Sequence, residues 1–272
     1  MNWWGKLIGG ALGFALGGGS PLGAILGAAL GHSLDKGIKG LESVNLGSGQ
    51  DQERIQLAFF TATFSIMGRV AKADGVVSET EIEVARQTMS KMQLSEEQKK
   101  AAINLFNQGK EAGFDYLSAV DQLKQVCGRK TNLLRMFMEI QLSTALADNE
   151  LHPEEQRLLI QIAEHLGFQK RHFEQILAMM TAQKRYSHFD HSGSSQINEH
   201  DAVEEAYKVL GIDQTCSDAQ LKKAYRKLTS QHHPDKLVSK GLPEEMMKMA
   251  TEKTREIRDA YERIKKFRAH SS

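Results

Sequence analysis

The chain has 272 residues, and its 35 basic side chains are balanced by 34 acidic ones. This balance gives no global field, so the net charge by itself gives no reason to expect nucleic acid or a strongly acidic partner. The two cysteines, Cys127 and Cys216, lie far apart with no CxxC or Cys/His spacing. That pattern argues against a disulfide framework or a zinc site and favours a reducing compartment. Abundant Ala, Leu, Met, Glu, Gln and Lys, with four prolines, predict an all-α protein.

Residues 1–35 are expected to form a membrane anchor. Between Lys6 and His32 lie 25 residues without a charge, which as a helix would span roughly 37 Å, enough to cross a bilayer core. Trp3 and Trp4 stand where interfacial aromatic anchors belong. Alternatives are a cleaved signal peptide and a hairpin or re-entrant segment, since GGGSP at 17–21 could split the helix.

The anchor also predicts self-association. Its glycines recur at every fourth residue in two series, Gly5, Gly9, Gly13, Gly17 and Gly19, Gly23, Gly27, Gly31. This spacing leaves a bare helical stripe along which a second backbone can approach, which predicts a homodimer through the membrane segment. Lys36 and Lys39 outnumber Lys6 across the segment, and this slight excess favours a cytoplasmic C-terminal side.

Residues 54–180 show apolar residues at helical spacing and contain an internal repeat. A shift of 74 positions superposes AKADGVVSETEIEVA, which starts at residue 71, on ALADNELHPEEQRLL, which starts at residue 145. Each copy consists of a helix end, an acidic turn and a new helix start. Four acidic residues occupy matching places in the two copies, Asp74, Glu81, Asp148 and Glu155.

Two interpretations of these acidic turns stay open. Ser78 with Glu81 forms a capping-box pattern, and Glu155 follows Pro153 in a first helical turn, so both glutamates have a structural explanation. Alternatively, the four carboxylates converge on a divalent cation, for which oxygen ligands are suited. Neither copy has EF-hand spacing. The KADG and ADNELHPEE turns within an all-helical unit resemble a TerB-type domain, a resemblance that implies a helical bundle used as an interaction module.

Residues 181–200 are polar, rich in Ser, Gly and His, and predict a flexible linker. From 201 to 272 the helical pattern returns. Val203, Ala206, Tyr207 and Leu210 share one face of a short helix, and a second helix after Ser217 has its apolar face at Leu221, Ala224, Tyr225 and Leu228. Its other face carries Lys222, Lys223, Arg226 and Lys227. A third helix packs through Ala250, Ile257, Ala260, Tyr261 and Ile264.

The second and third helices are separated by QHHPDK at 231–236. Proline fixes its own φ and holds the preceding residue extended, so the flanking side chains point in defined directions. Asp235 would then be an exposed acceptor suited to a partner arginine, and His233 a ring that can stack or donate. The basic stripe beside them would steer an acidic partner surface. A polar turn without function is the alternative.

The order YKVLGI, LKKAYRKL, HHPDK and IRDAYERI resembles the J domain of DnaJ-type co-chaperones over residues 201–267. This resemblance implies docking on a DnaK-type chaperone and stimulation of its ATPase. It implies that His233, Pro234 and Asp235 activate, and that Lys222, Lys223, Arg226 and Lys227 dock. One departure is Thr254, where the family often carries a large apolar residue. The glycine-rich anchor, TerB-like unit and C-terminal J domain are together similar to the DjlA-type membrane-anchored DnaJ-like co-chaperones.

The sequence therefore predicts a non-enzymatic co-chaperone, single-pass in a bacterial inner membrane, with a periplasmic N-terminus and a cytoplasmic bulk where the chaperone and ATP are found. No cofactor is expected. The alternative is a membrane scaffold or metal-responsive sensor in which the J domain is secondary. No nucleophile–base pair, phosphate loop or metal-ligand cluster in the sequence supports an enzyme.

Overall fold

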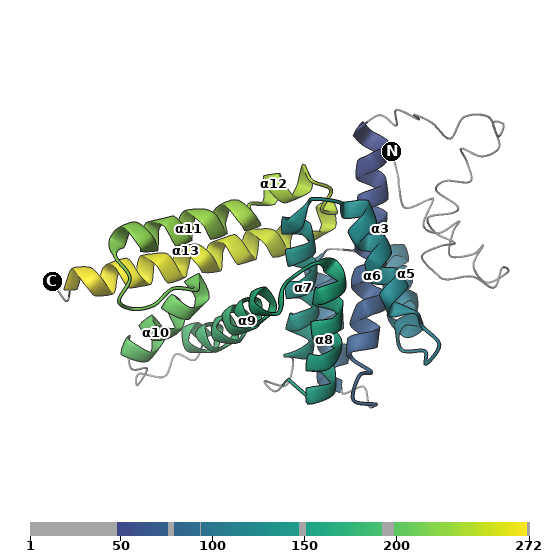
Figure 1. The fold of residues 1–272 in the computed structure, drawn as a ribbon, viewed down its shortest axis with the longest axis horizontal. Coiled ribbons are helices and arrows are strands. Elements are labelled where there is room, and N and C mark those ends of the chain that lie inside the picture. The colour runs from purple at the N-terminus through teal and green to yellow at the C-terminus, as the bar shows by residue number, and fades with distance from the viewer. Residues whose placement is uncertain (1–47, 76–78, 93, 147–150, 192–198, 271–272) are drawn as a thin grey trace.

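The computed structural model describes residues 48–75, 79–92, 94–146, 151–191 and 199–270. Every regular element in these ranges is a helix, as the composition predicts (Figure 1). The elements are α3 (Ser48–Val70), α4 (Glu79–Lys91), α5 (Glu96–Gly109), α6 (Tyr116–Cys127), α7 (Thr131–Ala145), α8 (Pro153–Leu166), α9 (Lys170–His191), α10 (Glu199–Leu210), α11 (Asp218–His232), α12 (Pro234–Val238), the 3₁₀ turn η1 (Glu244–Met246) and α13 (Met247–His270).

Helices α3 to α8 form a bundle around α3. From Ile55 to Val70 almost every residue of α3 is buried, including the rings of Phe59, Phe60 and Phe64. A helix that is apolar on all sides belongs inside a bundle, because no face of it can be left to solvent without cost. We refer to α3–α8 as the bundle.

Two glycines allow α3 and α5 to cross at very short range. A Cβ atom on Gly68 would lie 1.9 Å from the carbonyl oxygen of Phe106, and one on Gly109 would lie 1.8 Å from that of Ser65. Any side chain at either position would therefore force the two helices apart. The helix crossing that builds the bundle core depends on these two glycines.

Helices α11 and α13 form an antiparallel hairpin that projects from the bundle, with α10 packed against it (Figure 1). The predicted apolar faces are confirmed where Leu221, Leu228, Ile257 and Ile264 are buried together. The rings of Tyr225 and Tyr261 stack at a centroid distance of 4.2 Å across the hairpin. We refer to α11, α12, η1 and α13 as the hairpin.

The predicted flexible linker at 181–200 differs from the structure at both of its described ends, and residues 192–198 lie outside the described residues. Residues up to His191 continue α9 as a helix, and Ala182 and Tyr186 are buried in the hairpin core. The first half of α9 instead contributes Phe173 and Ile176 to the bundle core. This part of α9 is mostly polar, and its buried residues, Ala182 and Tyr186, are one helical turn apart. So few apolar residues do not stand out in the sequence as a helical pattern. Helix α9 thus joins the two cores directly.

The hairpin also contacts the bundle directly, through its α12–η1 segment. Leu237, Leu242 and Met246, with Ala250 at the start of α13, are buried in the core of the bundle rather than in that of the hairpin. Gly241 has a φ of +105°, and a Cβ atom there would lie 2.7 Å from the Ile55 side chain of α3. The hairpin is therefore packed onto the bundle through apolar surface on two sides.

Candidate functional site

The chain leaves the helix at a single residue of the HHPDK stretch. His233 lies between the end of α11 at His232 and the start of α12, with φ −59° and ψ 124°, and Pro234 stands in the first turn of α12. This extended conformation is the one that a following proline imposes, as expected from the sequence. A short helix begins at Pro234 itself, so His233 is the one residue that separates α11 from α12.

The motif presents its two polar side chains differently. The Asp235 side chain is 86% exposed and that of His233 is 43% exposed, and His233 Nδ1 lies 4.0 Å from Asp235 Oδ2. A carboxylate so exposed is available to a donor on another molecule.

The basic stripe lies on the solvent side of α11. All four of its members, Lys222, Lys223, Arg226 and Lys227, are exposed, whereas Leu221 and Leu228 on the opposite face are buried. The helix begins at Ser217, whose hydroxyl accepts the Gln220 amide in a capping box. Cap and apolar face together fix which way the cations point. We call these four residues the basic stripe.

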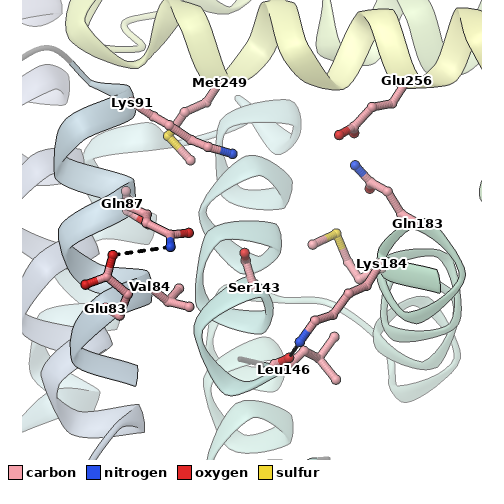
Figure 2. Close-up of a pocket in the computed structure, with 12 residues that line it drawn as sticks. Glu83, Val84, Gln87, Lys91, Ser143, Leu146, Gln183, Lys184, Met249 and Glu256 are labelled. Carbon is pink, nitrogen blue, oxygen red and sulfur yellow. Dashed lines mark hydrogen bonds between the residues drawn. The ribbon is translucent and has the colours of Figure 1, made fainter. Parts of the chain in front are cut away.

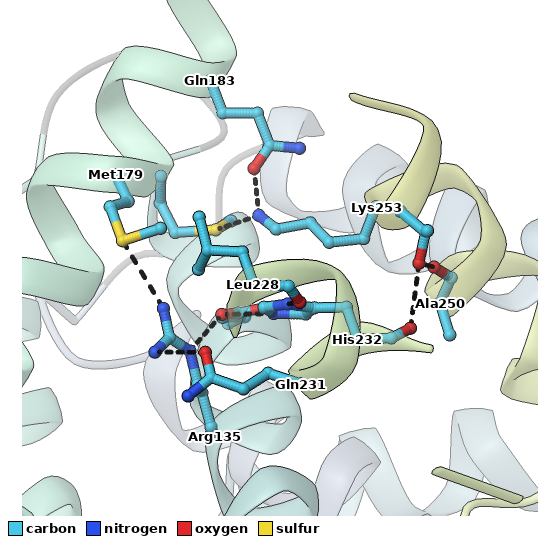
Figure 3. Close-up of polar contacts among 11 residues, drawn as sticks. Arg135, Met179, Gln183, Leu228, Gln231, His232, Ala250 and Lys253 are labelled. Atoms are coloured by element: carbon cyan, nitrogen blue, oxygen red, sulfur yellow. Dashed lines mark hydrogen bonds and ion pairs between the residues drawn. The ribbon is translucent and has the colours of Figure 1, made fainter. Parts of the chain in front are cut away.

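His232, directly before the motif, is buried between the hairpin and the bundle. Only 2% of its surface is exposed. Its Nδ1 lies 3.0 Å from the Leu228 carbonyl oxygen, and its Nε2 lies 3.0 Å from both carboxylate oxygens of Glu139 on α7. Figure 3 shows the His232 ring at the centre of these polar contacts, between Arg135 and Lys253.

Glu139 is held as a charged group in a buried position. Arg135 Nε donates to its Oε1 at 2.9 Å from one turn earlier on α7. Burial would raise the pKa of the Glu139 carboxyl, but the charges of His232 and Lys253, the hydrogen bond from His232 and the charge of Arg135 outweigh it. The net effect holds that pKa well below its ordinary value, so Glu139 is ionised at neutral pH.

The hairpin fixes His232 from its other side through Thr254. The Thr254 hydroxyl lies 3.0 Å from the carbonyl oxygen of His232 and 2.9 Å from that of Ala250, and it donates to one of them at a time. Lys253 Nζ donates to Gln183 Oε1 and approaches Met180 Sδ at 3.1 Å. Ring and carbonyl of His232 are therefore both engaged.

The proposed cation site is only partly within the described residues. Asp74 is exposed at the turn after α3, whereas Asp148 and the side chain of Glu81 lie outside the described residues. Glu155 is 3% exposed, and its Oε2 accepts the His152 amide at 3.0 Å, as a helix cap does. Within the described ranges no group of three or more His, Cys, Asp or Glu is placed to hold a metal. The cation hypothesis stays a prediction, and Glu155 has the capping role that the alternative assigns to it.

A cavity of about 430 Å³ lies where α4, α7, α9 and α13 meet (Figure 2). Figure 2 shows Glu256 from α13 pointing toward Gln183 of α9, with Lys91 and Met249 on the opposite side of the cavity. Burial raises the pKa of Glu256, an effect that Lys253 and Lys91 oppose. The cavity thus contains a carboxyl that is less stable in its charged form than an exposed one.

Three family descriptions match successive parts of the chain. Residues 1–51 match "Co-chaperone DjlA transmembrane domain", residues 60–178 match "Tellurite resistance protein TerB", and residues 205–268 match "DnaJ domain". A "Co-chaperone protein DjlA" from Coxiella burnetii is 44% identical over 274 residues, covering 99% of both chains. The chain belongs to the DjlA family.

Other DjlA relatives are similar over nearly their whole length. The "Co-chaperone protein DjlA" of Vibrio cholerae is 41% identical and that of Photorhabdus laumondii 40% identical, each covering 98% of both chains. No solved structure matches the chain. The family assignment confirms the predicted order of anchor, TerB-like unit and J domain.

The anchor of this DjlA-family chain falls in residues that the structure leaves undescribed. All eight glycines of the predicted dimer stripe lie before residue 48, outside the described residues. Among the helices that are described, none has the length and apolar character needed to span a bilayer. Membrane association therefore rests on the match of residues 1–51 to the DjlA transmembrane domain.

Glu139 and His232 are not among the site residues that the sequence predicts. The two residues are 93 positions apart, and only the packing of the hairpin onto the bundle brings them together. A signal was nevertheless present, because Arg135 and Glu139 form an i, i+4 charged pair inside the apolar run LLRMFMEIQL. Charges in a buried helix need a partner, and here the partner is His232. Thr254, noted as a departure from the J-domain pattern, belongs to the same contacts.

Proposed function

We propose that this chain is a membrane-anchored co-chaperone that docks a DnaK-type chaperone through the basic stripe. His233, Pro234 and Asp235 then stimulate ATP hydrolysis by that chaperone. The observation that carries the proposal is the 86% exposure of Asp235, beside a His233 that is held extended by Pro234. Apart from the 4.0 Å approach to His233, this carboxylate has no contact among the described residues that would explain its place in the fold.

The basic stripe supplies the matching electrostatic feature. Four exposed cations within six residues of one helix raise the local positive potential, although the net charge of the chain is only +1. Such a local field increases the rate of encounter with an acidic surface. We assign Lys222, Lys223, Arg226 and Lys227 to docking and the three motif residues to activation.

The proposed topology is a single span in a bacterial inner membrane, with the N-terminus periplasmic and the two folded units cytoplasmic, where the chaperone and ATP are found. Two copies associate through the glycine stripe of the anchor, because small residues allow close helix contact in a bilayer. Replacing Gly9 and Gly13 by leucine should weaken crosslinking between copies in membranes. Undiminished crosslinking would contradict the dimer.

The test of function is single-turnover ATP hydrolysis by a DnaK-type chaperone, with the full chain reconstituted in lipid nanodiscs. We expect the wild type to accelerate hydrolysis, the His233→Gln variant to lose this stimulation, and a His270→Gln control to retain it, because His270 is exposed at the far end of α13. Absence of stimulation by the wild type, or equal stimulation by His233→Gln, would overturn the proposal.

A further inference from the structure

His232 links the motif to the bundle. It is the residue before His233, so the peptide bond between them leads directly into the extended residue and Pro234. Its ring is 2% exposed and contacts a carboxylate from a different folded unit. The His232 ring therefore joins the hairpin to α7 of the bundle directly beside the motif.

The geometry around the ring requires a specific partner. The Leu228 carbonyl and the Glu139 carboxylate can only accept hydrogen bonds, so both ring nitrogens must carry a hydrogen for both contacts to form. A ring in that form is positively charged, and Glu139, which is 5% exposed, supplies the opposite charge. Replacing the carboxylate by a neutral group would leave the ring with a weaker and less directional partner.

Glu139 is itself held in one orientation. Arg135 donates to its Oε1 from the preceding turn of the same helix, and the Arg135 side chain is only 16% exposed. Arg135 also reaches Gln231, the neighbour of His232, at 3.4 Å. The bundle therefore presents a fixed carboxylate, and the position of the His232 ring follows from α7 rather than from the hairpin alone.

The carbonyl of His232 has a donor of its own, because the Thr254 hydroxyl lies 3.0 Å from it and donates either to it or to the Ala250 carbonyl. With the ring held by α7 and the carbonyl within reach of this donor on α13, the freedom of the peptide plane that enters His233 is reduced. The φ of −59° and ψ of 124° at His233 are therefore set from both sides, by these contacts before it and by Pro234 after it.

We propose that Glu139 is a positioning residue for the His-Pro-Asp motif, acting through His232, so that the TerB-like bundle takes part in activating the chaperone. This inference rests on the proposed function, since it assumes that the motif acts on a DnaK-type partner. It assigns to the bundle a role in the J-domain reaction itself, in addition to any binding by its own surface.

A positioning role makes a kinetic prediction that a docking role does not. The basic stripe is on the opposite, exposed face of α11, so replacing Glu139 leaves the docking surface unchanged. The maximal stimulation of ATP hydrolysis should fall, while the half-saturating concentration of the co-chaperone stays the same. We expect at least about a fivefold fall in the maximum with less than about a twofold change in half-saturation, because small misplacements of acting groups have large rate effects.

The experiment uses the full chain in nanodiscs, with single-turnover hydrolysis titrated for the wild type, Glu139→Gln and a matched control, Glu252→Gln. The control breaks the 3.1 Å ion pair between Glu252 and Lys91, which also joins the hairpin to the bundle but does not touch His232. Thermal unfolding identifies the temperature at which all variants are folded. The control should keep the wild-type maximum.

Thr254→Val decides the case if Glu139→Gln does not fold, because valine has nearly the same shape and removes only the hydroxyl. It should lower the maximum in the same way, by a smaller factor. A folded Glu139→Gln with the wild-type maximum, a changed half-saturation alone, or a wild-type maximum for Thr254→Val where Glu139→Gln is unfolded would each overturn the inference. If the wild type gives no stimulation, the proposed function and the inference both fail. If the wild type stimulates hydrolysis but the variants keep its maximum, only the inference fails.

Discussion

The two faces of the hairpin differ in what their residues do for the fold. On the open face, the basic stripe and Asp235 are exposed and contribute little to folding, since exposed charges add little to the free energy of unfolding. On the closed face, Leu237, Leu242 and Met246 are fully buried against the bundle. The open face therefore serves contact with a partner. The closed face, with its paired buried charge, serves to position the motif.

The contacts of the closed face also show that the hairpin and the bundle have to be studied together. Burying a side chain such as Leu237 stabilises by roughly 1.5–3 kcal/mol, and several such residues of the hairpin lie in the bundle core. Helix α9 adds Met179, Ala182 and Tyr186 to the hairpin core. A fragment that begins at residue 200 would lose both sets of contacts, so the co-chaperone should be tested as the full chain.

The largest expected effect comes from a substitution at Gly241, which would push the hairpin away from the bundle. An alanine there must adopt a φ of +105° and place its Cβ 2.7 Å from Ile55, so we expect the free energy of unfolding to fall by about 2–4 kcal/mol. Gly113→Ala is the control, because a Cβ atom at Gly113 meets nothing within 4 Å. Urea unfolding of the full chain in detergent, followed by circular dichroism, measures both. Equal midpoints for the two variants would contradict the close contact.

An intermediate effect is expected on the open face. Replacing Lys222 and Lys227 by glutamate should raise the half-saturating concentration for the chaperone by about tenfold at low salt, and the difference should shrink at high salt because screening shortens the Debye length. The free energy of unfolding should change by less than about 0.5 kcal/mol. The control is Lys100→Glu with Arg171→Glu, two exposed cations of other helices whose reversal changes the net charge equally. Equal titrations for the two double variants would remove the docking role from the stripe.

The smallest effect concerns Glu256, in the cavity between the two units. Burial raises its pKa, so the folded chain binds more protons than the unfolded one between the ordinary value of 4.5 and the raised value. Stability therefore falls as pH rises through this window, and the full cost is present above it. We expect Glu256→Gln to raise Tm slightly at pH 7 and to have no such effect near pH 4. Glu262→Gln, an exposed site on the same helix, should not alter Tm at either pH.

The parts of the site that follow from local pattern could be predicted from the sequence. The faces of α11, the extended His233 and the exposed Asp235 each depend on residues within a few positions, such as Ser217, Leu228 and Pro234. The Glu139–His232 contact depends on how two units pack and has no local sequence pattern. Residues 181–191 were wrongly predicted to belong to a linker because Ala182 and Tyr186 are sparse apolar residues in a polar segment, whereas residues 192–198 lie outside the described ranges. The cation hypothesis for Asp74, Glu81, Asp148 and Glu155 remains a prediction.

Amide hydrogen exchange of the full chain, with and without a DnaK-type chaperone and ATP, tests the division between open and closed faces most directly. The account predicts that residues 222–235 gain protection when the chaperone is added. Residues 237–250 should be protected already in the free chain and should not change. Rapid exchange of residues 237–250 in the free chain, followed by protection on adding the chaperone, would show that the hairpin is not held by the bundle and would contradict the account.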